Sequence, residues 1–152
     1  MNIFLCCSKH FYHKLPPYIQ ELEHLGHTIT VPNSYEHPFK EEEMKQQGKE
    51  GHIIWKSNML RQQALKVQAN DAVLVFNFEK NGQPNYIGGA TFLEIFKAFE
   101  LGKKIYLFNP IPDNIFKDEL TAINPVVLYG ELSHINLIIS SSKSYSLSPS
   151  RQ

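Results

Sequence analysis

Short apolar runs alternate along this chain with longer segments in which apolar residues recur at helical spacing. The short runs predict β-strands at Asn2–Cys6, His27–Val31, Ala72–Phe76, Ile105–Phe108 and Val126–Tyr129. The helical spacing predicts helices at Pro16–Leu25, Ile53–Val67 and Thr91–Leu101, with a weaker candidate at Asp113–Ile123. Between the second strand and the second helix, the polar segment Pro32–Gly51 is expected to form a surface loop with a short helix.

Strands that alternate with helices at this spacing indicate a parallel sheet covered by helices on both faces. Because crossovers are right-handed, few topologies remain. We expect the α/β class: a flavodoxin-like, Rossmann-like three-layer sandwich with a five-stranded parallel sheet in the order 2-1-3-4-5. One domain is expected over residues 1–138, and the Ser-rich residues 139–152 are predicted to be a disordered tail.

Apolar positions in two of the predicted helices indicate how each helix packs. The second helix has a plausible inner face made of Ile54, Trp55, Met59, Leu60, Ala64 and Val67. In the third helix, Phe92, Phe96 and Phe99 lie at helical spacing among further apolar residues. We therefore expect that helix to be covered on most sides and its aromatic rings to lie in the core.

The loop and helix start at Asn85–Glu94 are the most informative part of the chain. In parallel α/β sheets, ligands bind beyond the carboxyl ends of the strands, and residues that follow the first, third and fourth predicted strands are delivered there. The candidate substrate-binding residues are Cys7, Ser8, Asn77, Gly88, Gly89, Thr91 and Asn109. Glu94 is the one acid in the first turn of the expected helix, which makes it the candidate catalytic residue.

Two interpretations of Glu94 remain open. Thr91 and Glu94 fit a capping box, in which the carboxylate reaches back to the N–H of the N-cap residue. The same placement near the positive end of the helix dipole favours an ionised carboxylate. Such a carboxylate beside a sugar can attack or stabilise a cationic anomeric carbon.

Composition narrows the possible partners and cofactors. The chain has 152 residues with 15 basic and 15 acidic side chains, so charge gives no reason to expect a nucleic acid polymer or an acidic membrane as partner. No apolar segment is long enough to span a bilayer, and the N-terminus lacks a secretory signal pattern. The only two cysteines, Cys6 and Cys7, are adjacent and predict no disulfide scaffold, so we expect a cytoplasmic protein.

Motifs for cofactors and metals are absent from the sequence. Neither the Gly-x-Gly-x-x-Gly fingerprint nor a phosphate loop occurs, and Gly88-Gly89 by itself also fits a plain turn. The seven histidines lack zinc-site spacing. We expect no cofactor and no metal.

Several segments together resemble a known family. They are Met1–Ser8, Leu25–His27, Ala69–Val75, Gly88–Glu94 and Leu101–Pro112. With these motifs, roughly residues 1–135 are similar to the nucleoside 2-deoxyribosyltransferase-like family, which includes the 2′-deoxynucleoside 5′-phosphate N-hydrolases. The resemblance implies a Rossmann-like fold and a homodimer or higher oligomer with sites near subunit interfaces.

The resemblance also implies an activity on a small molecule. Members cleave or transfer at the N-glycosidic bond of a 2-deoxyribonucleoside or its 5′-monophosphate. Glu94 would be the nucleophile on C1′, and water or a second base would resolve the glycosyl-enzyme intermediate. Ser8 and the backbone around Cys7 would lie beside base or sugar. Gly88, Gly89 and Thr91 would lie beside the sugar or its phosphate.

The chain departs from the family pattern at two places. Members usually carry an acid on the helix before the third strand, whereas residues 51–70 contain no Asp or Glu, and Gln62, Gln63 and Leu65 occupy that neighbourhood. The first loop has Cys7-Ser8 where Gly-Ser is common. A nucleotide-binding or sensing domain that has lost turnover is therefore one alternative. Another is a phosphoribohydrolase of the lysine-decarboxylase-like type, although that group's fuller Pro-Gly-Gly-x-Gly-Thr pattern is missing.

Overall fold

A parallel five-stranded sheet forms the centre of the molecule, with strand order β2-β1-β3-β4-β5. The structure is a computed structural model, and it describes residues 1–137. The strands are β1 (Asn2–Cys6), β2 (Thr28–Thr30), β3 (Ala72–Val75), β4 (Lys104–Leu107) and β5 (Val126–Val127). The helices are η1 (Lys9–Lys14), α1 (Pro16–His24), α2 (Lys40–Gln46), α3 (Lys49–Ala69), α4 (Gly89–Glu100) and α5 (Lys117–Ile123).

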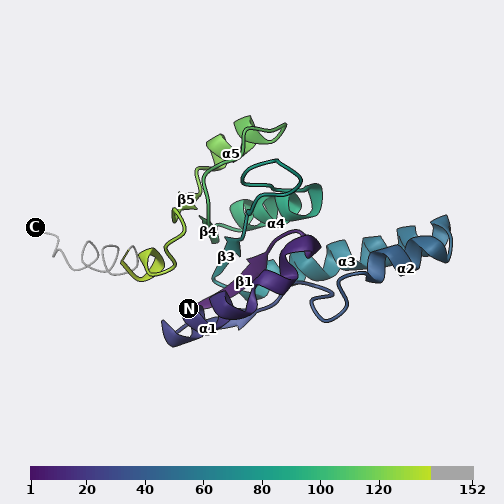
Figure 1. The fold of residues 1–152 in the computed structure, drawn as a ribbon, viewed down its shortest axis with the longest axis horizontal. Helices are drawn as coiled ribbons and strands as arrows, with labels where there is room; N and C mark the ends of the chain where they lie inside the picture. The colour runs from purple at the N-terminus through teal and green to yellow at the C-terminus, as the bar shows by residue number, and fades with distance from the viewer. Residues whose placement is uncertain (138–152) are drawn as a thin grey trace, which may run out of the picture.

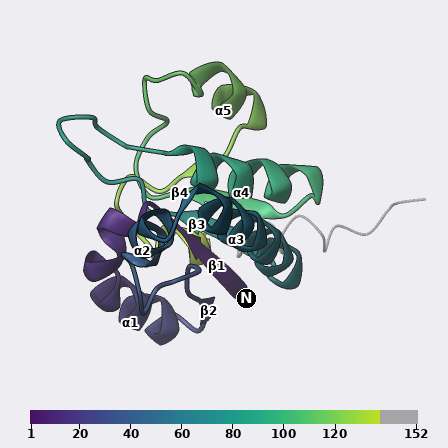
Figure 2. The same ribbon diagram turned by 90° about the vertical axis from the view of Figure 1, so that its right-hand side faces the viewer.

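Helices cover both faces of the sheet, so the predicted three-layer, flavodoxin-like α/β fold and its strand order are confirmed (Figures 1 and 2). Successive strand residues point to opposite faces and divide the core in two. Ile3, Leu74 and Tyr106 belong to the core that includes residues of η1, α1 and the C-terminal segment 128–137. Phe4 and Val73 belong to the core that includes residues of α3, α4 and α5.

The ends of the elements differ from the sequence predictions. The fifth strand has only two residues, because the backbone leaves the extended conformation at Tyr129, where φ is 51°. The weak helical candidate Asp113–Ile123 forms a helix only from Lys117. At the end of α4, Gly102 adopts a φ of 67°, and the N–H of Lys103 returns to the carbonyl of Ala98 at 2.8 Å. This left-handed glycine stops the helix just before β4 begins.

The predicted inner face of the second helix is only partly buried, and the expected burial of the third helix on most sides is wrong. In α3 only Val67 is buried, and Ile54 is 58% exposed. In α4, Phe96 and Phe99 are 47% and 50% exposed. A 21-residue helix is about 30 Å long at about 1.5 Å per residue, more than twice the length of a four-residue strand. Figure 1 accordingly shows α2 and the start of α3 projecting beyond the sheet.

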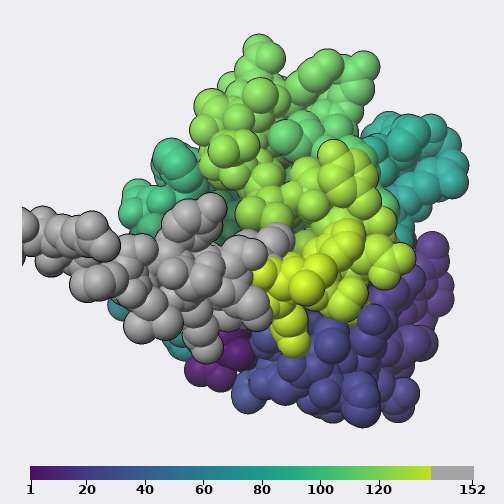
Figure 3. Space-filling model, turned by 90° about the vertical axis from the view of Figure 1, so that its left-hand side faces the viewer, coloured from purple at the N-terminus to yellow at the C-terminus, as the bar shows by residue number. Residues whose placement is uncertain are grey.

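The C-terminal part of the described chain packs against α1 and the turn into β2. Asn136 donates its side-chain N–H to the carbonyl of Leu25 at 3.2 Å, and its Oδ1 lies 2.7 Å from Nε2 of His27. Figure 3 shows this segment in yellow resting on the N-terminal part of the molecule. The predicted tail at 139–152 lies outside the described residues. Within residues 1–137, no helix has both the length and the apolarity needed to cross a membrane.

Burial of the sheet predicts a large difference between two isoleucines. Ile3 in β1 is fully buried, whereas Ile115 before α5 is 85% exposed. Ile3→Ala should lower the free energy of unfolding by about 2–5 kcal/mol, because it opens a cavity in the core. Ile115→Ala should change it by about 0.5 kcal/mol or less. Urea denaturation of both variants tests this, and equal losses would contradict the placement of β1.

Candidate active site

A cavity of about 260 Å³ opens beside the carboxyl end of β1 and the start of α4. This volume is close to the lower end of the range for small-molecule sites, about 300–1,000 Å³. The wall is built by four parts of the chain: the loop after β1 with η1, the segment from the end of β2 to α2, the inner side of α3, and the loop leading into α4. The residues that line the cavity include Cys7, Ser8, Lys9, His10, Tyr12, Glu41, Trp55, Lys56, Gln63, Lys80, Tyr86, Gly88, Gly89, Thr91 and Glu94.

Most of the site residues predicted from the sequence meet in this cavity. Cys7, Ser8, Gly88, Gly89, Thr91 and Glu94 all line it. The Ser8 hydroxyl also caps η1 by accepting the N–H of His10 at 3.4 Å. The Tyr86 side chain lies close to the backbone of Gly88. A Cβ at position 88 would lie 3.0 Å from the Tyr86 hydroxyl, a tighter contact than most side chains make, so glycine suits this position. The two loops that the sequence placed at one edge of the sheet therefore do come together.

Asn77 and Asn109 are placed elsewhere. Asn77 is fully buried and donates Nδ2–H to the carbonyls of Asn109 at 2.9 Å and Pro110 at 3.0 Å. In return, its Oδ1 accepts the N–H of Asn109 at 2.8 Å, and its carbonyl accepts Nδ2–H of Asn109 at 3.2 Å. These bonds join the ends of β3 and β4, and neither residue is part of the cavity wall. Their polar groups satisfy each other instead of a ligand.

The capping-box interpretation of Glu94 is wrong. The N-cap of α4 is Gly88, and no side chain caps the helix. Thr91 is the third helical residue and Glu94 the sixth, so Glu94 lies in the second turn. Its side chain faces the cavity and is only 7% exposed. The carboxyl group is therefore not used to hold the helix end.

Burial controls the charge of Glu94. Loss of water raises the pKa of this carboxyl to about 8, although a hydrogen bond from the Cys6 thiol and the charges of Lys66 and Lys56 act in the opposite direction. The expected ionisation by the helix dipole is thus wrong, because that effect is confined to the first turn. The Lys66 ammonium is fixed nearby by donating to the carbonyl of Val31 at 3.1 Å.

A second carboxylate in the cavity was missed by the sequence analysis. Glu41 of α2 accepts from His52 at 2.9 Å and pairs with Lys56 at 3.2 Å and Lys9 at 3.7 Å. Although burial favours its neutral form, the bonds from His52 and Lys56 and the charges of Lys56 and Lys9 lower the pKa of Glu41 to about 2. The sequence predicts a surface loop with a short helix here; α2 is that helix, but one of its acids faces the cavity. Its run of three acids was the only available signal.

Gln63 is the other residue whose role appears only in three dimensions. It lines the cavity from α3, in the neighbourhood where the resembling family carries an acid. Its Nε2–H donates to the carbonyl of Ala90 at 3.1 Å, in the first turn of α4. Gln63 therefore links α3 to α4, the helix that carries Glu94. The bond uses only the side-chain nitrogen of Gln63 and not its side-chain oxygen.

The arrangement combines two carboxyl groups in opposite protonation states. At neutral pH, Glu41 is ionised and Glu94 is mostly protonated, a separation that is typical of sites for acid, base or nucleophilic chemistry. Trp55, Tyr12 and Tyr86 add aromatic surface to the wall. Within residues 1–137, no group of three or more His, Cys, Asp or Glu side chains gathers as a metal site.

No protein-family model matches this chain, and no curated protein matches it significantly. The fold and the cavity define the class: a flavodoxin-like α/β protein with a cavity of about 260 Å³ at the carboxyl edge of its sheet. The buried acid Glu94 is the feature of this cavity with the clearest chemical consequence.

Burial of Glu94 predicts an unusual dependence of stability on pH. Its pKa of about 8 in the folded state exceeds the ordinary glutamate pKa of 4.5, so the folded state binds more protons between these values. Stability should therefore fall as pH rises from 5 to 8 and level off above 8.

Two matched variants test this. Glu94→Gln should abolish the fall in stability between pH 5 and 8, and Glu21→Gln, on the exposed surface of α1, should leave that fall unchanged. The measurement is the melting temperature across this pH range, where each kcal/mol corresponds to roughly 2–4 °C. Parallel pH curves for the wild type and Glu94→Gln would show that the carboxyl is not buried.

Proposed function

We propose that this protein cleaves or transfers at the N-glycosidic bond of a 2-deoxyribonucleoside or its 5′-monophosphate, with Glu94 as nucleophile. The observation that carries this proposal is the position of the Glu94 carboxyl on the wall of the cavity at the carboxyl edge of the sheet. The resemblance of the surrounding loops to the nucleoside 2-deoxyribosyltransferase-like family gives the reaction its class.

The reaction requires the ionised form of Glu94. The carboxylate attacks C1′, the bond from C1′ to the base nitrogen breaks, and the base leaves with that electron pair and takes up a proton from solvent. Water or a second base then attacks C1′ and gives a proton to solvent, and the bond from C1′ to Glu94 breaks so that Glu94 is released as a carboxylate. The ammonium groups of Lys66 and Lys56 favour the ionised carboxylate that begins this sequence.

The remaining wall offers contacts suited to a nucleoside. Trp55 and Tyr12 provide ring surface against which a base can stack, and the Ser8 hydroxyl and the oxygen of Gln63 provide polar contacts. Gln63 also holds the first turn of α4 through Ala90, which fixes the helix that presents Glu94. A sugar bound between these groups and Glu94 would bring its anomeric carbon toward the Glu94 carboxyl.

Base release and its pH profile test the proposal. For an active deoxynucleoside or deoxynucleoside 5′-monophosphate, kcat/KM should rise about tenfold per pH unit below 8 and level off above it, because the carboxylate must be deprotonated. Glu94→Gln should lower the rate by about 10³-fold or more, and Glu21→Gln should leave it unchanged. Release of free base is followed chromatographically.

The other outcomes separate the alternatives. If wild type and Glu94→Gln are indistinguishable on every substrate of the panel, the enzymatic proposal is rejected. Nucleotide binding without base release would favour the sensing domain, a reading supported by a nucleophile that is mostly protonated at neutral pH. Preference for ribonucleoside 5′-monophosphates would favour the phosphoribohydrolase alternative.

A homo-oligomer is part of the same proposal. Leu93, Phe96 and Phe99 are 48%, 47% and 50% exposed on the outer side of α4, next to α3 with Leu65 at 62%. A contiguous apolar surface of this kind is typical of a protein interface. Its occupant would be a second copy of the chain, since the resembling family forms homodimers.

Removing the apolar character of this helix face should therefore separate the copies. Phe96→Glu combined with Phe99→Glu should convert a dimer to a monomer, because carboxylates cannot be buried without partners. Ile115→Glu, also exposed but before α5, should have no effect. Sedimentation velocity reads the outcome, and a wild type that is monomeric at every concentration would reject the oligomer.

A further inference from the structure

The three lysines of the cavity wall differ in their counter-charges. Lys9 pairs with Glu42 and lies 3.7 Å from Glu41, and Lys56 lies 3.2 Å from Glu41. Lys80 has no carboxylate within ion-pair distance among residues 1–137, and its ammonium lies over the ring of Tyr86, 4.5 Å from the centroid. Lys80 is therefore the cation of this wall that remains available to an anionic ligand.

A tight turn fixes Lys80 at the cavity. The N–H of Lys80 donates to the carbonyl of Gln83 at 3.0 Å, and the N–H of Gln83 returns to the carbonyl of Lys80 at 2.9 Å. Between them, Asn81 and Gly82 have φ values of 49° and 80°, as a hairpin turn of this type requires. The backbone of Lys80 is thus held in place, and its side chain also rests on Tyr86 rather than extending freely into solvent.

His10 adds a ring N–H, a possible hydrogen-bond donor, on the same side of the cavity. It follows Ser8 and Lys9 in the loop after β1 and lines the cavity together with Lys80. Burial and the neighbouring charges of Lys80 and Lys9 lower the pKa of His10, with Glu42 acting in the opposite direction. Glu79, the adjacent acid, shares a shallow depression with His10 and Lys80 but forms no ion pair with them.

We propose that Lys80 and His10 form an anion subsite that binds the phosphate of a phosphate monoester. Lysine binds phosphate as a point charge, and the Ser8 hydroxyl lies in the same loop as an additional donor. This inference rests on the proposed function, and it selects the 2-deoxyribonucleoside 5′-monophosphate over the free nucleoside. Lys9 and Lys56 are excluded from this role because Glu41 and Glu42 already neutralise them.

Binding measurements with two matched lysine variants test the subsite. Lys80→Gln removes the free cation, whereas Lys104→Gln removes an exposed cation at the first residue of β4, which lines neither the cavity nor the shallow depression that His10 and Lys80 share. Both are made in the Glu94→Gln background, which prevents turnover. The probes for calorimetry are the four common 2-deoxyribonucleosides, their 5′-monophosphates and inorganic phosphate.

The expected result is a preference that depends on Lys80. With Lys80 present, a monophosphate should bind about tenfold or more tightly than its nucleoside, as one charged contact permits. Lys80→Gln should reduce this ratio to about twofold or less, and Lys104→Gln should preserve it. Inorganic phosphate should compete with the monophosphate but bind more weakly, since it lacks base and sugar.

Other results overturn the inference. Equal affinity for nucleoside and monophosphate, equal effects of the two lysine variants, or no binding of either probe would each reject the subsite. Inorganic phosphate that binds as tightly as the nucleotide would reject a nucleotide substrate. Lys80-dependent binding without any base release by the wild type would instead reject the proposed reaction and leave the anion subsite established.

Discussion

The site depends on one constraint: the Glu94 carboxyl is held at the edge of the apolar core. Burial there disfavours its charged form, and only a few positive groups act in the opposite direction. Glu94 is 7% exposed and borders the fully buried Cys6 of β1. The ammonium of Lys66 is itself partly withdrawn from water, since burial lowers its pKa. The balance leaves Glu94 close to its protonation midpoint near pH 8, a state suited to a group that must change charge during a reaction.

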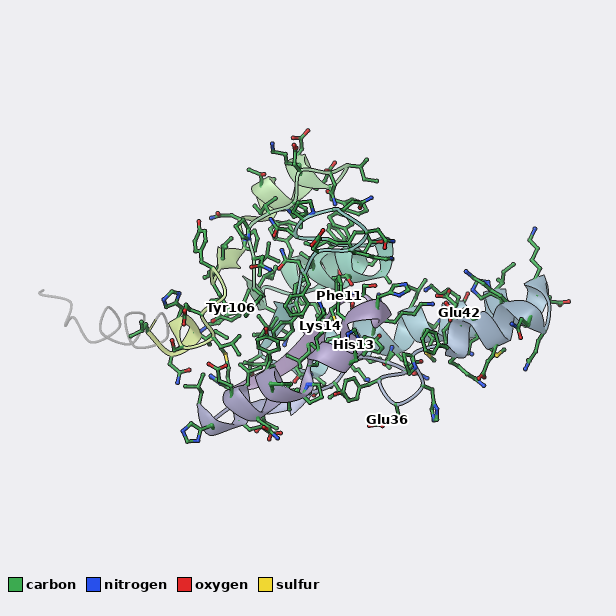
Figure 4. All side chains as sticks on the ribbon, viewed as in Figure 1. Phe11, His13, Lys14, Glu36, Glu42 and Tyr106 are labelled. Atoms are coloured by element: carbon green, nitrogen blue, oxygen red, sulfur yellow. The ribbon has the colours of Figure 1, made fainter. Side chains whose placement is uncertain are left out.

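The part of the cavity wall around Glu41 differs from the surroundings of Glu94, because the carboxylate there has charged partners. Glu41 accepts a hydrogen bond from His52, pairs with Lys56 and Lys9 and stays ionised, so it holds these side chains in place instead of exchanging a proton. Figure 4 shows the adjacent Glu42 on α2, the helix that brings this charge cluster to the body of the protein. Lys9 and Lys56 are neutralised by Glu41, whereas Lys80 on the hairpin after β3 pairs with no carboxylate among residues 1–137. The positive charge of the cavity wall is therefore concentrated at Lys80, and this uneven charge can orient a charged ligand.

Helix length explains both the open cavity and the exposed apolar surface. Because α3 is far longer than the strands it covers, its first half cannot pack on the sheet and forms cavity wall with α2. Its second half packs beside α4, and both helices keep apolar side chains on their outer sides. Within a single chain, the inner faces of these helices are packed and the apolar side chains on their outer faces stay exposed, as at many protein interfaces.

The sequence by itself determined the architecture, because strand and helix periodicity and right-handed crossovers are local or general constraints. It also determined that the loops of Ser8 and Gly88 meet near Glu94, since parallel strands end at one edge. Only the tertiary structure decided that Asn77 binds Asn109, that Glu41 lines the cavity, and that burial raises the pKa of Glu94. Each of these depends on distant residues or on the depth of burial, which no spacing along the chain encodes.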